Sequence, residues 1–282
     1  MGLKIEPLST ALGARILGLN LEYVVSESNL SRLKDAFFKY HLLCIEGTPL
    51  NSSNFLRFAR LFGEPQMQLL RNRYDEKPPE VFILESTYKT EKSKPDDLTR
   101  MRLSGWHTDD SYFEKPAKAT ILQSLAIPKS GAQTRFSNTR KAFDEMPSSV
   151  RCNIENLIAV HSYDTVRAIA RPQKLTLEKT SETRDVQHPL LRTHDDTGLK
   201  SIYLNPNRTD RIVGMARAES DNLLDVVYAW VTKKEFQYHH NWSLGDILLW
   251  DNRCLLHSVN VDYPVGQKRK HQRILLKDGR PI

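Results

Sequence analysis

The sequence is poor in cysteine, and it has no long apolar run. Its three cysteines, Cys44, Cys152 and Cys254, are odd in number and far apart. This spacing argues against a disulfide framework and against a cysteine-rich zinc site. No run approaches the roughly 18 apolar residues of a membrane span, and residues 2–7 mix charge and proline instead of forming a secretory leader. We therefore expect a cytosolic protein without a membrane partner.

The charge balance is basic, with a formal net charge of +7 and a pI near 9.2. The 41 lysines and arginines are spread along the chain and interleaved with 34 acids. Nucleic-acid binding usually requires clustered basic residues, so this pattern argues against such a partner. A small anionic substrate would explain the positive balance equally well.

The first third of the sequence predicts helices alternating with short strands. Residues 28–40 place apolar side chains on one helical face, with Ser28 or Asn29 as the cap. Residues 42–45 are typical of a buried strand. Ser52 is positioned to cap a second helix, which Gly63 and Pro65 would end. We expect these helices to form an N-terminal cap on the rest of the fold.

Short apolar runs recur between turn signals in the remainder of the chain. This spacing favours an antiparallel sandwich or barrel over a wound parallel sheet. One helix interrupts the pattern, with an acidic first turn at Glu219 and Asp221. We find no linker and predict a single domain over residues 1–282, mainly β with flanking helices. The predicted strands are 119–125, 134–137, 158–162, 187–193, 200–204, 247–250 and 273–276.

Residues 88–100 are rich in lysine, aspartate and serine and have no apolar periodicity. They predict a loop that leads directly into Trp106 and His107. Such a loop is placed either to act as a lid over a site or to serve as a solvated connection.

A possible metal site begins at Trp106-His107-Thr108-Asp109. A histidine and a carboxylate two residues apart on an extended segment point to the same side. His257, far along the chain, would complete the two-histidine, one-carboxylate face that binds non-haem Fe(II) with open positions opposite. These three residues are our candidate metal ligands and the centre of the catalytic site.

A second His-x-Asp pair, His194 and Asp196, competes with this assignment. It lies between two predicted strands and is followed by Thr197 and Gly198, which favours a hairpin turn. We expect this pair to be structural. The other histidines, in or beside predicted strands and helix ends, are also interpreted as structural, and His271 is left unassigned.

The chain resembles the taurine dioxygenase (TauD/TfdA) family of Fe(II)- and 2-oxoglutarate-dependent dioxygenases from about Leu8 to Pro281. The motifs are specific in combination, and the resemblance implies a double-stranded β-helix, or jelly roll. It also implies an enzyme that uses dioxygen, and a dimer or tetramer is common among similar proteins. The matching motifs are residues 12–14, 58–63, 106–109, 130–134, 188–194, 245–253 and 269–273.

The resemblance also implies roles for single residues. It places iron on His107, Asp109 and His257, and the distal carboxylate of 2-oxoglutarate on Arg269 with help from the Thr134 hydroxyl. A guanidinium suits this role because it gives a carboxylate two parallel charge-assisted bonds.

Arg273 lies four residues beyond Arg269, so the two face the same side of a strand, and in similar enzymes the matching arginine holds the substrate anion. Trp106 and Trp250 are expected to line the site, with a plain core role as the alternative for Trp250.

Two departures from the family pattern concern the substrate. Residues 66–74 contain no histidine, although taurine-specific members carry a histidine and a tyrosine in this region that reach the substrate. Arg208 stands about where the family often has an aromatic or small residue beside the substrate. We therefore list Arg208 with Arg273 as candidate substrate-binding residues and expect a substrate other than taurine.

The leading hypothesis is a dioxygenase that hydroxylates a small anionic compound, such as a carboxylate, aryloxyalkanoate or sulfonate, while 2-oxoglutarate is decarboxylated to succinate. The alternatives are desaturation or oxidative decarboxylation with the same cofactors, and a basic oxygenase directed to nucleic acid. Halogenation is disfavoured because it generally requires the carboxylate position to be vacated, and Asp109 is present.

Overall fold

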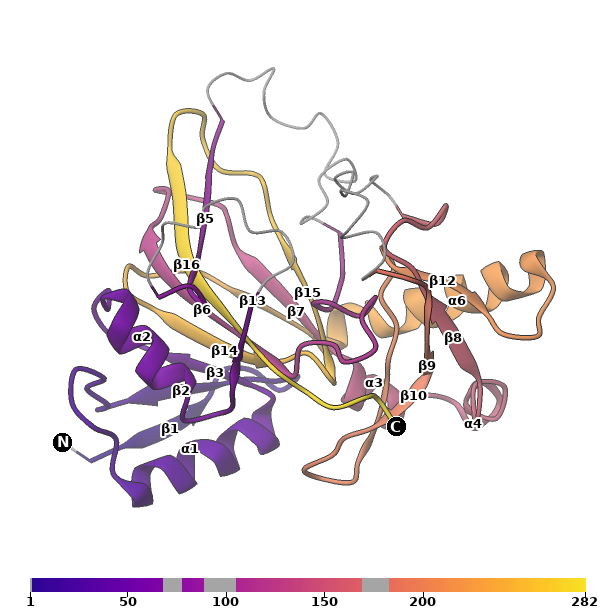
Figure 1. The fold of residues 1–282 in the computed structure, drawn as a ribbon, viewed down its shortest axis with the longest axis horizontal. Helices are drawn as coiled ribbons and strands as arrows, with labels where there is room; N and C mark the ends of the chain where they lie inside the picture. Colours follow the sequence, from indigo (N-terminus) through magenta and orange to yellow (C-terminus); the bar gives the residue numbers. More distant parts are fainter. Residues whose placement is uncertain (1, 68–77, 89–104, 169–182) are drawn as a thin grey trace.

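A computed structural model describes residues 2–67, 78–88, 105–168 and 183–282 of the protein. Strands predominate, and several helices flank them (Figure 1). The helices are α1 Glu27–Tyr40, α2 Ser52–Ala59, α3 Thr139–Asp144, α4 Ser148–Arg151 and α6 Arg217–Val231, with a short 3₁₀ helix at Lys234–Phe236.

The main sheet has eight strands in the order β1-β2-β3-β14-β6-β16-β4, with β5 also paired to β16. All its pairs are antiparallel except that of β2 with β3. Strands from both ends of the chain therefore lie side by side in its centre (Figure 1). Its members are β1 Lys4–Pro7, β2 Ala14–Leu17, β3 Leu42–Ile45, β4 Pro65–Gln66, β5 Phe82–Thr87, β6 Ala119–Ala126, β14 Ile247–Asp251 and β16 Lys268–Leu276.

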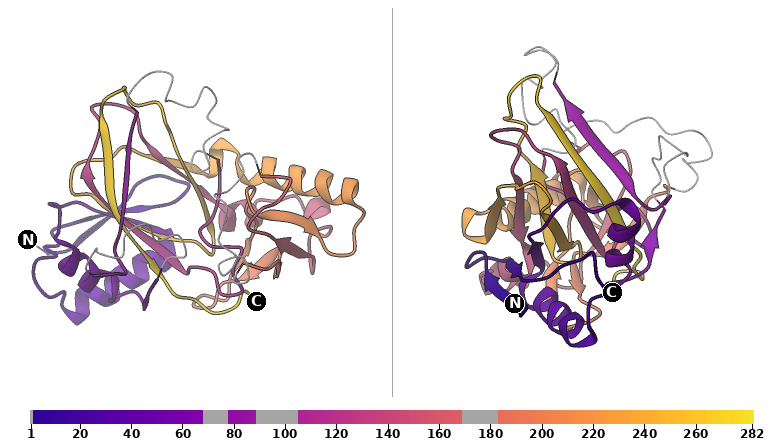
Figure 2. Two further views of the ribbon diagram at one scale, coloured as in Figure 1. Left: turned by 45° about the horizontal axis from the view of Figure 1, so that its top comes forward. Right: turned by 90° about the vertical axis from the view of Figure 1, so that its left-hand side faces the viewer.

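Three smaller sheets complete the fold. The sheet β13-β7-β15 faces the main sheet, because Phe136 of β7 and Leu255 of β15 share one buried apolar cluster with Leu122 of β6 and Leu248 of β14. The sheets β12-β8-β9 and β10-β11 lie with α6 at the far end from the N-terminal helices (Figure 2). Their strands are β7 Thr134–Asn138, β8 Ile158–His161, β9 Val186–Pro189, β10 Leu191–Thr193, β11 Lys200–Ile202, β12 Thr209–Ile212, β13 Gln237–His240 and β15 Leu255–Val259.

The N-terminal helices form where the sequence predicted them, but both caps were misassigned. Ser26 caps α1, since its Oγ accepts the Asn29 backbone N–H at 3.3 Å, whereas Ser28 and Asn29 are already helical. Asn51 caps α2 through its side-chain oxygen, so Ser52 is the first helical residue and not the cap. The helices bury their apolar sides with the main sheet in a second core.

The predicted antiparallel β character is confirmed, with two differences in the strands. The predicted strand 187–193 is divided between β9 and β10, which belong to different sheets. The break lies at Leu190, whose N–H donates to Leu157 O at 2.8 Å outside either ladder. The strands β1, β4, β12, β13 and β15 were not predicted. In addition, all but the first residue of the proposed lid at 88–100 lies outside the described residues.

Among the helices that the structure describes, none combines the length and apolar character needed to cross a membrane.

Candidate metal and cosubstrate site

His107 and His257 are brought together by a single β-bridge. Each backbone N–H donates to the other residue's carbonyl, at 2.9 and 2.8 Å, and the two imidazole rings lie 4.1 Å apart between centroids. The prediction that His107 and Asp109 lie on one extended segment was wrong, because the chain turns after Thr108 and Asp110 takes a left-handed φ of 58°. The turn still carries Asp109 to the same place as the two histidines.

The predicted ligands His107, Asp109 and His257 form one cluster. Their candidate ligand atoms all lie within 4.8 Å of one another, with His257 Nε2 at 3.7 Å from Asp109 Oδ2. His107 Nδ1 lies 2.9 Å from the Gly105 carbonyl, and a hydrogen bond there leaves Nε2 available for a metal. Two imidazoles and one carboxylate are a donor set that fits Fe(II) and leaves positions open for other ligands.

The electrostatics of the cluster favour the unprotonated forms that bind metal. Burial opposes ionisation of Asp109, but His257, Arg273 and His107 outweigh it, and the pKa of the carboxyl falls to about 2. Burial, with a smaller contribution from His107, lowers the pKa of His257 to about 3. A charged carboxylate and neutral imidazoles are the forms that coordinate a cation.

A chain of three hydrogen bonds, donated one after another, ends at the Asp109 carboxylate. Trp250 Nε1 donates to Asn252 Oδ1 at 3.0 Å, and Asn252 Nδ2 donates to Thr120 Oγ1 at 2.8 Å. Thr120 Oγ1 in turn donates to Asp109 Oδ2. Partners of this kind fix the orientation of a metal ligand. The sequence analysis missed Thr120, and only its position on β6, a strand predicted to be buried, hinted at a role.

A pocket opens beside the three ligands and contains the predicted cosubstrate residues. Arg269 is buried, and burial lowers the pKa of its guanidinium to about 10. Within the described residues, its guanidinium makes one long hydrogen bond, from Nη2 to Thr134 Oγ1 at 3.4 Å, and its Nε has no partner. A buried cation with so little compensation fits a carboxylate in this pocket. The pocket is lined by Leu84, His107, Asp109, Leu122, Thr134, Trp250, His257, Val259, Arg269 and Arg273.

Arg273 faces the same pocket from the same strand, as the spacing predicted. Its Nη1 lies 3.9 Å from Asp109 Oδ1, and its guanidinium lies over the Phe82 ring at 5.7 Å. The structure therefore places one arginine beside the metal ligands and another, Arg269, deeper on β16.

Arg208 is not among the residues that line this pocket. It is buried, with its guanidinium 5.0 Å from the ring centroid of Tyr163 and 5.5 Å from that of Tyr112. Its Nη1 donates to the carbonyl of Asn207 at 3.0 Å. Tyr112 follows the turn that carries Asp109, so the contact with Tyr112 places Arg208 near the site region.

The rival pair at residues 194 and 196 has structural partners, as expected. His194 Nε2 lies 2.9 Å from Asp251 Oδ2, and Asp196 accepts from Arg253 Nη1 at 2.7 Å. Both residues lie in the hairpin between β10 and β11. These contacts hold the hairpin against the loop between β14 and β15 and occupy the atoms that a metal would need.

A second group of possible metal ligands lies deeper between the sheets, at Cys44, His240 and Asp246. His240 contacts the Tyr238 hydroxyl through Nδ1 and Asp246 Oδ2 through Nε2. Burial raises the pKa of the Cys44 thiol, so the sulfur keeps its proton. The sequence analysis did not single out this group, and its members are satisfied by one another and by the core.

The comparisons with known proteins agree with this geometry. The family model described as taurine catabolism dioxygenase TauD, TfdA family matches residues 4–275. An alpha-ketoglutarate-dependent sulfate ester dioxygenase of Pseudomonas putida is 29% identical over 288 residues, covering 99% of this chain and 91% of that protein. The (S)-phenoxypropionate/alpha-ketoglutarate-dioxygenase of Sphingobium herbicidovorans is also 29% identical, covering 96% and 94%.

Among solved structures, AAD-2 in complex with Mn(II) and N-oxalylglycine matches with a TM-score of 0.82 at 25% identity, covering 100% of this chain and 99% of that one. The fold and the His-Asp-His metal site thus define an alpha-ketoglutarate (2-oxoglutarate)-dependent dioxygenase. The chain belongs to the TauD, TfdA family.

Proposed function

We propose that this enzyme hydroxylates a small anionic organic substrate, such as a sulfate ester, a sulfonate or an aryloxyalkanoate. The observation that carries the proposal is the position of Arg273, whose guanidinium lies 3.9 Å from Asp109 and faces the pocket. An arginine there can bind an anionic group by charge-assisted hydrogen bonds and hold the attached carbon chain next to the metal.

The relatives support this substrate class. Their names state a sulfate ester and a phenoxypropionate as substrates, and both compounds carry a negatively charged group. The absence of a histidine from residues 66–74 supports a substrate other than taurine.

In this proposal His107, Asp109 and His257 hold Fe(II). Iron bound there supplies the activation of dioxygen that couples decarboxylation of 2-oxoglutarate to oxidation of the substrate. The chain's own side chains bind and orient the reactants. Arg269 and Thr134 bind the distal carboxylate of 2-oxoglutarate in the pocket, while Trp250 and the apolar pocket residues exclude water.

Arg208 is assigned to the outer edge of the substrate site. Its place against Tyr112 and Tyr163 supports a role in shaping that edge or in attracting an acidic group.

The main sheet and the sheet β13-β7-β15 face each other. This arrangement supports a double-stranded β-helix in one domain over residues 1–282. The cytoplasmic location and a dimeric or tetrameric assembly stay predictions from the sequence.

A screen of anionic compounds tests the proposal. Purified protein with iron, ascorbate and 2-oxoglutarate should release succinate faster with at least one sulfate ester, sulfonate or aryloxyalkanoate. The product should carry a hydroxyl group, whereas desaturation or loss of carbon dioxide would identify the alternative outcomes by mass spectrometry. If no compound in these classes stimulates succinate release, the proposed substrate class is wrong.

Variants then identify the arginine that the substrate meets. Arg273→Ala should raise the KM for the substrate by about 100-fold, because removing one partner of a desolvated charge pair costs several kcal/mol. Arg208→Ala should have a smaller effect that depends on the size of the substrate. Arg15→Ala is a matched control, since this exposed arginine pairs with Glu46 in the N-terminal part of the fold. An unchanged substrate KM in Arg273→Ala would remove Arg273 from the substrate site.

A further inference from the structure

Trp242 lies directly behind the cosubstrate pocket, although it does not line it. Its indole Nε1 donates to Thr134 Oγ1 at 3.0 Å. The indole is held edge-on between two histidine rings, His240 at 4.9 Å and His271 at 4.5 Å between centroids. The side chain therefore has a fixed position from which its N–H points at a pocket residue.

The contact with Trp242 limits which hydrogen bonds the Thr134 hydroxyl can make. A hydroxyl oxygen has two lone pairs and one hydrogen. Trp242 Nε1 and Arg269 Nη2 both donate to Thr134 Oγ1, at 3.0 and 3.4 Å, and so occupy both lone pairs. No hydrogen bond donated by this hydroxyl occurs within the part of the chain that the structure describes. Since Thr134 lines the pocket, its hydrogen is left to be donated there.

We propose that Trp242 is a positioning residue for 2-oxoglutarate, which acts by making the Thr134 hydroxyl an obligate donor to the distal carboxylate. The inference rests on the proposed assignment of Thr134 and Arg269 to that carboxylate. Without the indole N–H, the Thr134 hydroxyl could rotate and donate elsewhere, and part of the preorganisation of the pocket would be lost.

The surroundings of Trp242 favour such a role. Tyr238 and Asp246 anchor His240 through its two ring nitrogens. His271 is fully buried on β16, two residues from Arg269, and neither of its ring nitrogens has a hydrogen-bond partner among the residues that the structure describes. Burial, with Arg269 nearby, holds the pKa of His271 well below its ordinary value. An uncharged ring thus packs on the indole without competing with Arg269 for the carboxylate.

The test measures ligand binding and not turnover. Enzyme loaded with Mn(II) is titrated with 2-oxoglutarate and, separately, with 2-oxobutanoate, which has the same metal-chelating group but no distal carboxylate. Trp242→Phe keeps an aromatic ring in the stack and removes the N–H. We expect it to weaken 2-oxoglutarate binding about 3- to 10-fold, the effect of one hydrogen bond, and to leave 2-oxobutanoate binding unchanged.

A double-mutant cycle shows whether Trp242 acts through Thr134. Thr134→Val removes the hydroxyl while keeping the shape, so Trp242→Phe should have no further effect on 2-oxoglutarate affinity in this background. Trp230→Phe is the matched control, because Trp230 Nε1 donates to the Ala142 carbonyl in a different core. Equal weakening of both ligands, or additive effects in the cycle, would overturn the inference.

The same measurements test the role of Trp242 separately from the proposed assignment of Thr134 and Arg269 to the distal carboxylate. If Thr134→Val and Arg269→Gln both leave 2-oxoglutarate affinity unchanged, the proposed cosubstrate residues are wrong. If these variants bind weakly but Trp242→Phe binds normally, only the role of Trp242 fails. Should Trp242→Phe not fold, the indole N–H resonance of Trp242 in the wild-type protein replaces it. That resonance must shift with 2-oxoglutarate and not with 2-oxobutanoate.

Discussion

Thr120 Oγ1 lies 2.5 Å from Asp109 Oδ2, deep between β6 and the turn that carries the carboxylate. Because the same hydroxyl oxygen accepts from Asn252 Nδ2, its hydrogen is directed at Asp109. The orientation of Asp109, one of the metal ligands, is therefore set by Thr120 on β6. The orientation of the Thr120 hydroxyl is set in turn by Asn252, in the loop before β15.

Thr120→Val should lower the affinity for Fe(II) by about 10- to 100-fold, the usual effect of losing a partner that orients a metal ligand. Metal titration of the purified protein measures it. Thr139→Val is the control, since the Thr139 hydroxyl donates to the Cys254 carbonyl and not to a ligand. Equal metal affinities in the two variants would contradict the role of Thr120.

Asp109→Ala should abolish both stoichiometric metal binding and 2-oxoglutarate turnover, because only two histidines then remain on the metal face. Asp196→Asn, in the second His-x-Asp pair, should retain both, since Asp196 is bonded to Arg253. The metal content of both variants, measured after dialysis against Fe(II) under anaerobic conditions, tests these two expectations. Loss of metal from Asp196→Asn alone would reverse the assignment.

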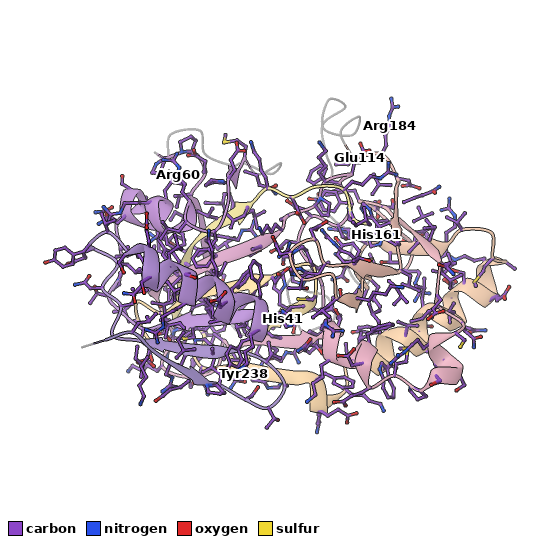
Figure 3. All side chains as sticks on the ribbon, turned by 90° about the horizontal axis from the view of Figure 1, so that it is seen from below. His41, Arg60, Glu114, His161, Arg184 and Tyr238 are labelled. Atoms are coloured by element: carbon purple, nitrogen blue, oxygen red, sulfur yellow. The ribbon has the colours of Figure 1, made fainter. Side chains whose placement is uncertain are left out.

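Two buried histidines predict a loss of stability in acid. His161 and His188 pack ring to ring at 5.1 Å between centroids, and His161, which is labelled in Figure 3, is the buried last residue of β8. Burial lowers the pKa of His188 to about 4 and that of His161 well below the ordinary 6.5. Between about pH 6.5 and 4, the unfolded chain therefore binds more protons than the folded one, so the free energy of unfolding falls as the pH is lowered.

Each proton contributes a slope of about 1.4 kcal/mol per pH unit in that range. Urea denaturation at several pH values measures the slope. His161→Gln should reduce it, while a substitution at His239, which is exposed, should change it less. A slope that is the same in His161→Gln and in the wild type would show that His161 titrates alike in both states.

Gly245 occupies a turn that has no room for a side chain. Its φ is +91°, and a Cβ would lie 2.2 Å from the Gly47 carbonyl oxygen. Gly245→Ala should lower the free energy of unfolding by about 3 kcal/mol or more. Gly198→Ala, at a φ of +69° with nothing within 4 Å, should cost only about 1 kcal/mol. Chemical denaturation measures the free energy of unfolding of both variants. The loss in Gly198→Ala reports the backbone strain alone, and the additional loss in Gly245→Ala reports the steric overlap.

The sequence alone was sufficient for the elements that follow simple periodicity. The amphipathic helices α1 and α6 and the apolar strand β3 were predicted near their observed bounds, because one buried face imposes a regular pattern. The cap of α1 was missed because Ser26, Ser28 and Asn29 are all good cap residues, and only the backbone angles decide between them.

The candidate ligands His107, Asp109 and His257 could also be proposed from residue types and spacing, although the reasoning about the extended segment was wrong. The segment is a single bridge followed by a turn. The prediction of the cluster succeeded because the chemistry needs those residue types, and not because the local geometry was correctly derived.

Only the tertiary structure decided which side chains support the site. Thr120 and Trp242 are ordinary residues in the sequence, and nothing in their spacing relates them to Asp109 or Thr134. The hydrogen bonds from Trp242 to Thr134 and from Asn252 to Thr120 each join residues more than 100 positions apart. Such contacts depend on which distant strands pair, here β13 with β7 and β14 with β6, whereas the helices, the strands and the ligand types follow from local sequence.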